Sequence, residues 1–169
     1  MDARPILLTV ARALRDNKLE AILIGNAAAV LQGAPVTTLD ADFLFRKTPV
    51  NLAKLKAVAR ALGAVVFAPY YPISGLYRLI RDDDSLQLDF MTTIHGVRSF
   101  NSLRSRAFLI DLGGDESILT ADLSDIIASK RAAGRARDRA VLHVLEATLE
   151  EKKKPSGTKR GSRSPRQGK

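Results

Sequence analysis

The sequence contains no cysteine and no tryptophan, and its only histidines are His95 and His143. Without cysteine the chain can form neither a disulfide framework nor a thiolate metal site, and two histidines argue against structural zinc. No apolar run approaches the length that spans a bilayer. The first 20 residues are amphipathic and interrupted by charges, unlike the uncharged core of a signal peptide. We therefore expect a cytoplasmic protein with no membrane-spanning segment.

The positive charge is concentrated at the C-terminus. The chain has 169 residues and a net charge of +9, but residues 152–169 hold eight Lys or Arg and no acid, which leaves 19 basic and 18 acidic residues before them. This segment is also rich in Ser, Gly and Pro, so it cannot bury enough apolar surface to order. We predict one folded domain over residues 1–151 and a disordered basic tail over 152–169. The tail either binds RNA or DNA non-specifically or only increases solubility.

Two aspartates lie close together on the second predicted strand of the chain. Residues 20–25 form an apolar strand, 27–33 a small helix, and 39–45 a second strand that carries Asp40 and Asp42. Residues two apart on a strand share a face, and paired carboxylates suit Mg²⁺, which fills its shell with substrate phosphates. A solvated edge strand is the alternative, but the apolar residues that follow Asp42 indicate an internal strand.

Further acidic residues lie in a predicted hairpin, and one of them could join Asp40 and Asp42. The segments LYRLI and LQLDFMT are joined by Asp82-Asp83-Asp84-Ser85 and predict a hairpin. Asp89 lies on the polar face of its second strand. Its rivals in the turn are ordinary hairpin-turn residues, so Asp89 is preferred, although a polar face against solvent is the other interpretation. Arg78, on the first hairpin strand, could line the same cleft.

The remaining pattern predicts an α+β protein with a mixed sheet, flanking helices and a helical C-terminal segment. Its expected helices cover residues 5–17, 51–63, 97–105, 121–134 and 137–153, and its further expected strands include AVVFA, AFLIDL and SILTA. Between AVVFA and LYRLI we expect a loop that contains Tyr70, Tyr71 and Pro72.

Four motifs occur in a familiar order: Gly25-Asn26, Asp40-Ala41-Asp42, Asp89, and the block from Ser129 to Asp138. Together they resemble the DNA polymerase β-like nucleotidyltransferase superfamily. They are most similar to its small bacterial branch related to abortive-infection and toxin–antitoxin enzymes. The chain differs from that branch in two places. Asn26 replaces the second small residue of the glycine pair, and Val36 stands where the branch often has arginine.

The resemblance implies a nucleotidyltransferase fold, Mg²⁺ or Mn²⁺ as cofactor, and a nucleoside triphosphate such as ATP as substrate. Asp40, Asp42 and Asp89 would bind the metal and act in catalysis. The nucleotide would contact Gly25 and Asn26 at the first turn, Thr38 before the metal strand, and Lys130, Arg135 and Asp138 near the C-terminal helices. Lys130 could equally belong to a solvated helix face. A cognate toxin or antitoxin partner is implied by the resemblance alone.

These observations predict metal-dependent transfer of NMP from an NTP to an acceptor hydroxyl on an RNA 3′ end, a protein or a small molecule. The alternative is a catalytically inactive protein of the same fold that binds nucleic acid or a partner through its tail. A metal-dependent phosphodiesterase or nuclease that uses the same acids is a third hypothesis.

Overall fold

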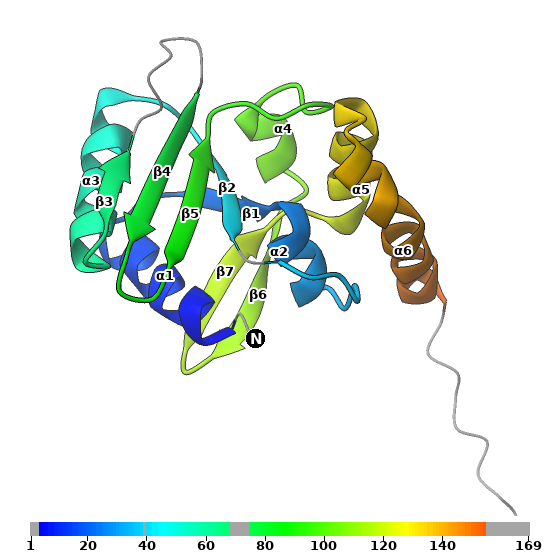
Figure 1. Cartoon of the computed structure of the whole chain (residues 1–169), viewed down its shortest axis with the longest axis horizontal. Helices are drawn as coiled ribbons and strands as arrows, with labels where there is room; N and C mark the ends of the chain where they lie inside the picture. The colour runs from blue at the N-terminus through cyan, green and yellow to red at the C-terminus, as the bar shows by residue number, and fades with distance from the viewer. Residues whose placement is uncertain (1–3, 39, 68–74, 155–169) are drawn as a thin grey trace, which may run out of the picture.

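The computed structural model describes residues 4–38, 40–67 and 75–154. Strands and helices alternate irregularly along the chain (Figure 1). The strands are β1 Ala21–Ile24, β2 Ala41–Phe45, β3 Val65–Phe67, β4 Leu76–Arg81, β5 Leu86–Met91, β6 Phe108–Gly113 and β7 Glu116–Thr120. The helices are α1 Arg4–Asp16, α2 Gly25–Leu31, α3 Pro49–Ala61, α4 Phe100–Arg104, α5 Leu123–Ala133 and α6 Ala136–Lys153.

The strands form one mixed sheet in the order β3-β4-β5-β2-β1-β7-β6. The pairs β2–β5 and β1–β7 are parallel, and the other neighbours are antiparallel. The predicted hairpin is β4–β5, with Arg78 directly opposite Asp89. The mixed sheet, the flanking helices and the C-terminal helical segment confirm the predicted α+β class.

Alternation along β2 and β5 separates an apolar face from an acidic one. Phe43 lies opposite Phe90 in the register, and their rings stack with centroids 4.9 Å apart. Both side chains are fully buried. The neighbouring pair in the same register, Asp42 and Asp89, must then point to the opposite face. The parallel pairing of these two strands therefore places two carboxylates side by side.

Local sequence signals mark the start of α3 and both ends of α5. Thr48 caps α3 by accepting a hydrogen bond from the Asn51 amide, and Pro49 occupies its first turn. Asp122 caps α5, and Gly134 ends it in the left-handed conformation. This glycine turns the chain into α6, so that α5 and α6 form a helical pair at one side of the sheet (Figure 1).

One buried side chain joins this helical pair to the sheet. Gln32, after α2, donates to the carbonyl of Ala121 and accepts from the amide of Leu123, at the junction of β7 and α5. Its Oε1 also accepts from the Lys152 Nζ of α6. Lys152 was assigned to the tail from the sequence, but α6 runs two residues beyond the predicted domain boundary, to Lys153. Gln32 therefore holds α5 and α6 beside α2.

Several predicted elements start at different residues in the structure, and two of these differences concern the candidate site. Helix α2 begins at Gly25, so Gly25 and Asn26 form its first turn instead of preceding it. Strand β2 begins at Ala41, so Asp40 lies just before the strand and only Asp42 lies on it. The predicted loop with Tyr70, Tyr71 and Pro72, and all of the tail after residue 154, lie outside the described residues. Among the described helices, none is long and apolar enough to cross a membrane.

Candidate active site

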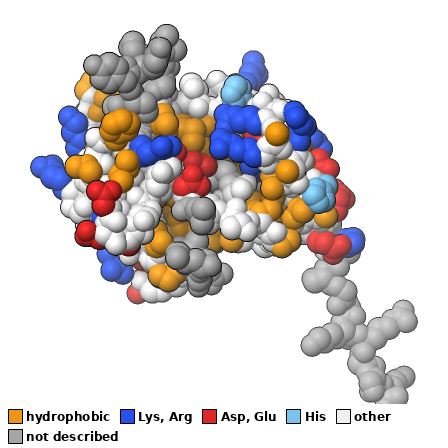
Figure 2. Space-filling model, in the orientation of Figure 1, with side chains coloured by type: hydrophobic (Ala, Val, Ile, Leu, Met, Phe, Trp, Pro, Cys, Tyr) orange, Lys and Arg blue, Asp and Glu red, His pale blue; other side chains and the backbone are white. Residues whose placement is uncertain are grey.

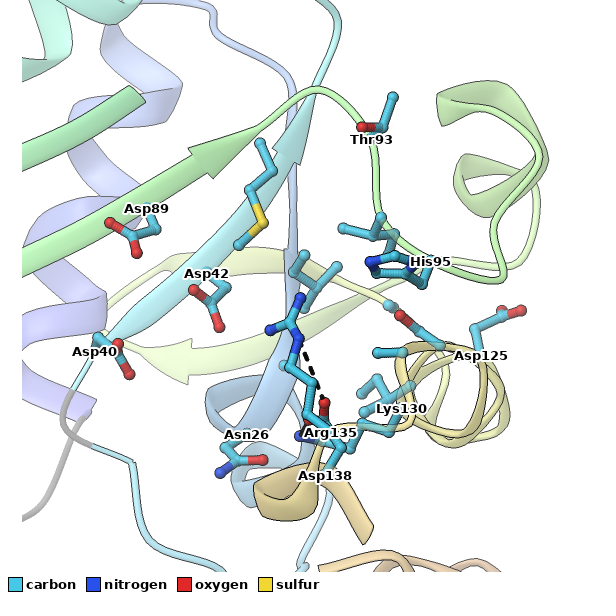
Figure 3. A pocket seen from close by; sticks show the side chains of 18 of the residues that line it. Asn26, Asp40, Asp42, Asp89, Thr93, His95, Asp125, Lys130, Arg135 and Asp138 are labelled. Atoms are coloured by element: carbon cyan, nitrogen blue, oxygen red, sulfur yellow. Dashed lines mark hydrogen bonds and ion pairs between the residues drawn. The ribbon is translucent and has the colours of Figure 1, made fainter. Parts of the chain in front are cut away.

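The carboxylates of Asp40, Asp42 and Asp89 converge at one edge of the acidic face. One oxygen from each lies within 4.8 Å of the others. Figure 3 shows the three side chains directed toward the same space from β2, β5 and the segment before β2. The turn residue Asp84 pairs with Arg81 and is exposed. The structure therefore brings together the three carboxylates that the sequence selected.

Mutual repulsion and burial act most strongly on Asp42. Burial, together with the nearby charges of Asp40 and Asp89, raises the pKa of Asp42 to about 6. Lys130 and Arg137 act against this shift across the cleft. Three clustered carboxylates are destabilised unless positive charge compensates them. Their oxygen atoms are the ligands that Mg²⁺ and Mn²⁺ prefer, so the residues present fit a divalent cation.

Gly25 allows the first turn of α2 to approach this cluster. Its φ is +68°, which L-residues with a side chain rarely adopt. A Cβ on Gly25 would also lie 2.6 Å from Oδ2 of Asp42. Both the backbone conformation and the space beside Asp42 therefore require glycine here.

Asn26 lines the cleft, and its side-chain amide is only partly hydrogen-bonded. Its Nδ2 donates to the Thr37 carbonyl at 3.2 Å, which determines the orientation of the amide. Its Oδ1 is buried and has no hydrogen-bond partner among the described residues. The hydroxyl of Thr38, another predicted nucleotide contact, donates to the Asp40 carbonyl at 2.6 Å. Thr38 is not among the described residues that line the cleft; its hydroxyl supports the turn before β2.

Arg78 is bound to the third carboxylate. Its Nε and Nη2 each donate to a different oxygen of Asp89, both at 2.7 Å. Asp89 is only 6% exposed, so a paired charge is what makes its burial tolerable. The sequence placed Arg78 near the cleft but gave no sign of this contact, because it depends on the exact register of β4 and β5.

The opposite wall of the cleft carries positive charge from the C-terminal helices. Lys130 on α5 contacts Oδ1 of Asp138 on α6 at 3.2 Å. Arg135 lies 3.9 Å from the other oxygen of Asp138, which is buried and accepts no hydrogen bond from the described residues. Arg137 also lines the cleft, although the sequence interpretation had not selected it. No ion pair to Arg137 is found within the described residues.

These two walls enclose a cleft of about 490 Å³. Figure 2 shows acidic side chains in the hollow and basic side chains on the side of the C-terminal helices. Beyond the carboxylates the lining includes Met91, Thr93, Ile94 and His95, from β5 and the segment after it. The cleft thus has an acidic wall, a basic wall and a more neutral end, which suits a ligand with several phosphates and a second, less charged group.

Known structures provide an independent comparison. The antibiotic-resistance factor ANT(2'')-Ia is 14% identical with a TM-score of 0.61, covering 90% of this chain and 88% of its own. TM1012 from Thermotoga maritima, provisionally named a nucleotidyltransferase, is 16% identical with a TM-score of 0.57, covering 87% and 92%. A nucleotidyltransferase-like protein from Paracoccidioides brasiliensis is 14% identical with a TM-score of 0.56, covering 89% and 77%.

No model of a known protein family matches the chain, and no curated protein matches it. These structural matches cover 87–90% of the chain. They do not distinguish the toxin–antitoxin branch from others, so that branch stays a prediction. The chain therefore has the fold of these nucleotidyltransferase structures, the fold that its sequence motifs indicated.

Proposed function

We propose that this protein is a divalent-cation-dependent nucleotidyltransferase that transfers NMP from a nucleoside triphosphate to an acceptor hydroxyl. The observation that carries the proposal is the convergence of Asp40, Asp42 and Asp89 within 4.8 Å, opposite a basic wall. Clustered carboxylates alone are common on protein surfaces. Here one of them is buried, another has a strongly raised pKa, and they line a cleft in a nucleotidyltransferase fold.

The proposed reaction is an in-line displacement at the α-phosphorus. The acceptor oxygen forms a bond to the α-phosphorus while the bond from that phosphorus to the α,β-bridging oxygen breaks and pyrophosphate leaves. The proton of the acceptor hydroxyl passes to Asp89, which lies beside Asp42 on the sheet. A bound Mg²⁺ or Mn²⁺, held by Asp40, Asp42 and Asp89, would stabilise negative charge on the phosphate oxygens as a Lewis acid.

The basic wall would hold the phosphates that leave. Lys130, Arg135 and Arg137 line the cleft from α5 and α6, opposite the carboxylates. Asp138 orients Lys130 through their 3.2 Å contact. Gly25 lets the Asp42 carboxylate lie directly against the first turn of α2. Positioning and charge neutralisation of this kind supply much of the rate enhancement in phosphoryl-group transfer.

The acceptor is proposed as an RNA 3′ end, a protein side chain or a small molecule. The basic tail favours RNA slightly, because a cationic segment attracts polyanions. ANT(2'')-Ia has been solved in complex with adenylyl-2''-tobramycin, which shows that a protein of this fold can carry an adenylylated small molecule. We therefore keep small hydroxylated acceptors in the proposal. A toxin–antitoxin setting, with a cognate partner, belongs to the same proposal.

Label transfer tests this function directly. Purified protein is incubated with each α-labelled NTP and Mg²⁺ or Mn²⁺ in total RNA, in protein extract and with aminoglycosides. We expect label on one acceptor class, and its loss in Asp42→Asn. Asp83→Asn, an exposed hairpin-turn variant that also removes one carboxylate, serves as the matched control and keeps activity. Hydrolysis of nucleotide without transfer would indicate the phosphodiesterase hypothesis, and no reaction at all would favour the inactive binding protein.

A further inference from the structure

Among the basic side chains of the described cleft, Arg78 makes the most direct contact with the acidic cluster. It stands directly opposite Asp89 in the β4–β5 register, and its guanidinium donates to both oxygens of that carboxylate. Asp89 is 8% exposed at its side chain and Arg78 is 35% exposed. The two-point contact therefore holds the carboxylate in one orientation.

The two hydrogen bonds from Arg78 leave lone pairs of the Asp89 carboxylate available. An ionised carboxylate has about four lone-pair sites, and the two donors from Arg78 use one on each oxygen. The remaining lone pairs can face Asp40 and Asp42, whose oxygens lie within 4.8 Å. Asp89 can thus keep its contact with Arg78 and still accept a proton or contact a cation.

Arg78 also changes the charge that the cluster presents. With all three acids ionised, Asp40, Asp42 and Asp89 carry three negative charges, and Arg78 cancels one. Asp40 and Asp42 also interact favourably with the Arg78 charge, so its influence extends beyond its direct partner. A net charge of about −2 is matched by one divalent cation rather than two.

We propose that Arg78 is a positioning residue that orients Asp89 and limits the acidic cluster to one divalent cation, held mainly by Asp40 and Asp42, until a nucleotide enters. The proposal rests on the proposed function, because it concerns the same cluster. In this arrangement Asp89 is the proton acceptor of the reaction, and the phosphates of the substrate supply the negative charge that any second cation needs.

Two effects of Arg78 then act in opposite directions. Its positive charge opposes cation binding, and its two hydrogen bonds to Asp89 keep that carboxylate in position for the transfer reaction. Removing the charge should tighten cation binding while transfer slows. A residue with a purely structural role would weaken both together, because the carboxylates would lose their arrangement.

The test measures Mn²⁺ binding to the nucleotide-free protein by electron paramagnetic resonance titration, alongside label transfer. For wild type we expect one Mn²⁺ per chain. Arg78→Gln should bind Mn²⁺ about tenfold more tightly, the effect of one nearby unit charge on a divalent ion with water-like screening. Arg78→Lys keeps the positive charge and loses the two-point contact with Asp89. Its Mn²⁺ affinity should therefore stay within about twofold of wild type, whereas its kcat should fall at an unchanged KM for NTP.

Arg81→Gln is the matched control. Arg81 lies on the same strand and makes a similar two-point contact with Asp84, but away from the cleft. It should leave Mn²⁺ affinity and transfer unchanged. Arg78→Gln leaves Asp89 buried and unpaired, which can prevent folding. In that case the kcat of Arg78→Lys tests whether Arg78 positions Asp89.

Each result has a distinct meaning. No Mn²⁺ binding by wild type would contradict the proposed function itself. One bound Mn²⁺, with unchanged or weaker affinity in folded Arg78→Gln, would overturn the charge effect of Arg78 and leave the function standing. Two Mn²⁺ bound by nucleotide-free wild type, or full kcat in Arg78→Lys, would overturn the inference as well.

Discussion

Replacing Asp42 by asparagine should stabilise the cation-free protein. The substitution keeps the shape of the side chain and removes a charge that the fold disfavours. An aspartate that titrates near 3.8 in the unfolded chain titrates at about 6 here, since burial and the neighbouring carboxylates oppose its ionisation. At neutral pH the ionised form therefore costs about 3 kcal/mol of folding free energy.

The sign of the pH dependence follows from the raised pKa. The folded state binds the Asp42 proton more tightly than the unfolded state does. This contribution to stability is thus largest below pH 3.8, decreases as the pH rises to about 6, and is constant above that. The free energy of unfolding of Asp42→Asn should therefore equal that of wild type at low pH and exceed it at pH 7.5.

Urea unfolding in the presence of EDTA measures the effect. At pH 7.5 the variant should be more stable by about 3 kcal/mol, or about 6–12 °C in melting temperature for a chain of this size. At pH 5 the difference should fall to roughly half, because wild-type Asp42 is then partly protonated. Added Mn²⁺ should stabilise wild type and have little effect on the variant, which lacks a ligand for it.

The exposed variant Asp83→Asn is the control, and its stability should change by no more than about 0.5 kcal/mol. An Asp42→Asn protein that is equally or less stable than wild type at pH 7.5 in EDTA would refute the reasoning. It would mean that the carboxylate is compensated within the protein and that the cluster has no electrostatic need for a cation.

Three further predictions concern the cleft. Gly25→Ala should destabilise the fold by about 1–3 kcal/mol in urea unfolding and weaken Mn²⁺ binding, because the new methyl group meets Asp42 at a strained φ. Asn26→Ser should tighten NTP binding several-fold in calorimetry, because a hydroxyl can donate to a phosphate where the amide presents only an acceptor. Lys130→Ala should weaken NTP binding and lower stability by about 3–5 kcal/mol, because it leaves Asp138 buried without its main partner.

The Gly25 and Lys130 variants each have a control on the same scaffold. Gly33→Ala has a positive φ but open space around the new Cβ, so it separates backbone strain from the clash and should retain Mn²⁺ binding. Arg131→Ala breaks the exposed pair with Glu146 and should change stability by less than about 1 kcal/mol. If Asn26→Ser binds NTP no better than wild type, the acceptor oxygen does not face the phosphates.

Short-range patterns in the sequence determined most of the elements of this fold. Apolar alternation and turn residues predicted the β4–β5 hairpin, and helical periodicity predicted a helix over residues 121–134, where α5 lies. The same local logic selected Asp40 and Asp42 as a pair. It also placed Asp89 on the polar face of its strand, which distinguished it from the acids in the turn. Such signals are readable because each depends on residues close together in the chain.

Only the tertiary structure decided which side chains meet. Parallel pairing of β2 with β5 set Asp42 beside Asp89, and antiparallel pairing of β4 with β5 set Arg78 against the same carboxylate. A shift of one residue in either register would turn these groups to the apolar face. The turn at Gly134 brought Arg137 to the cleft, although nothing in its local sequence marks it. Strand register and helix orientation arise from long-range packing. For that reason the contact of Arg78 with Asp89 and the place of Arg137 in the cleft could not be predicted from the sequence.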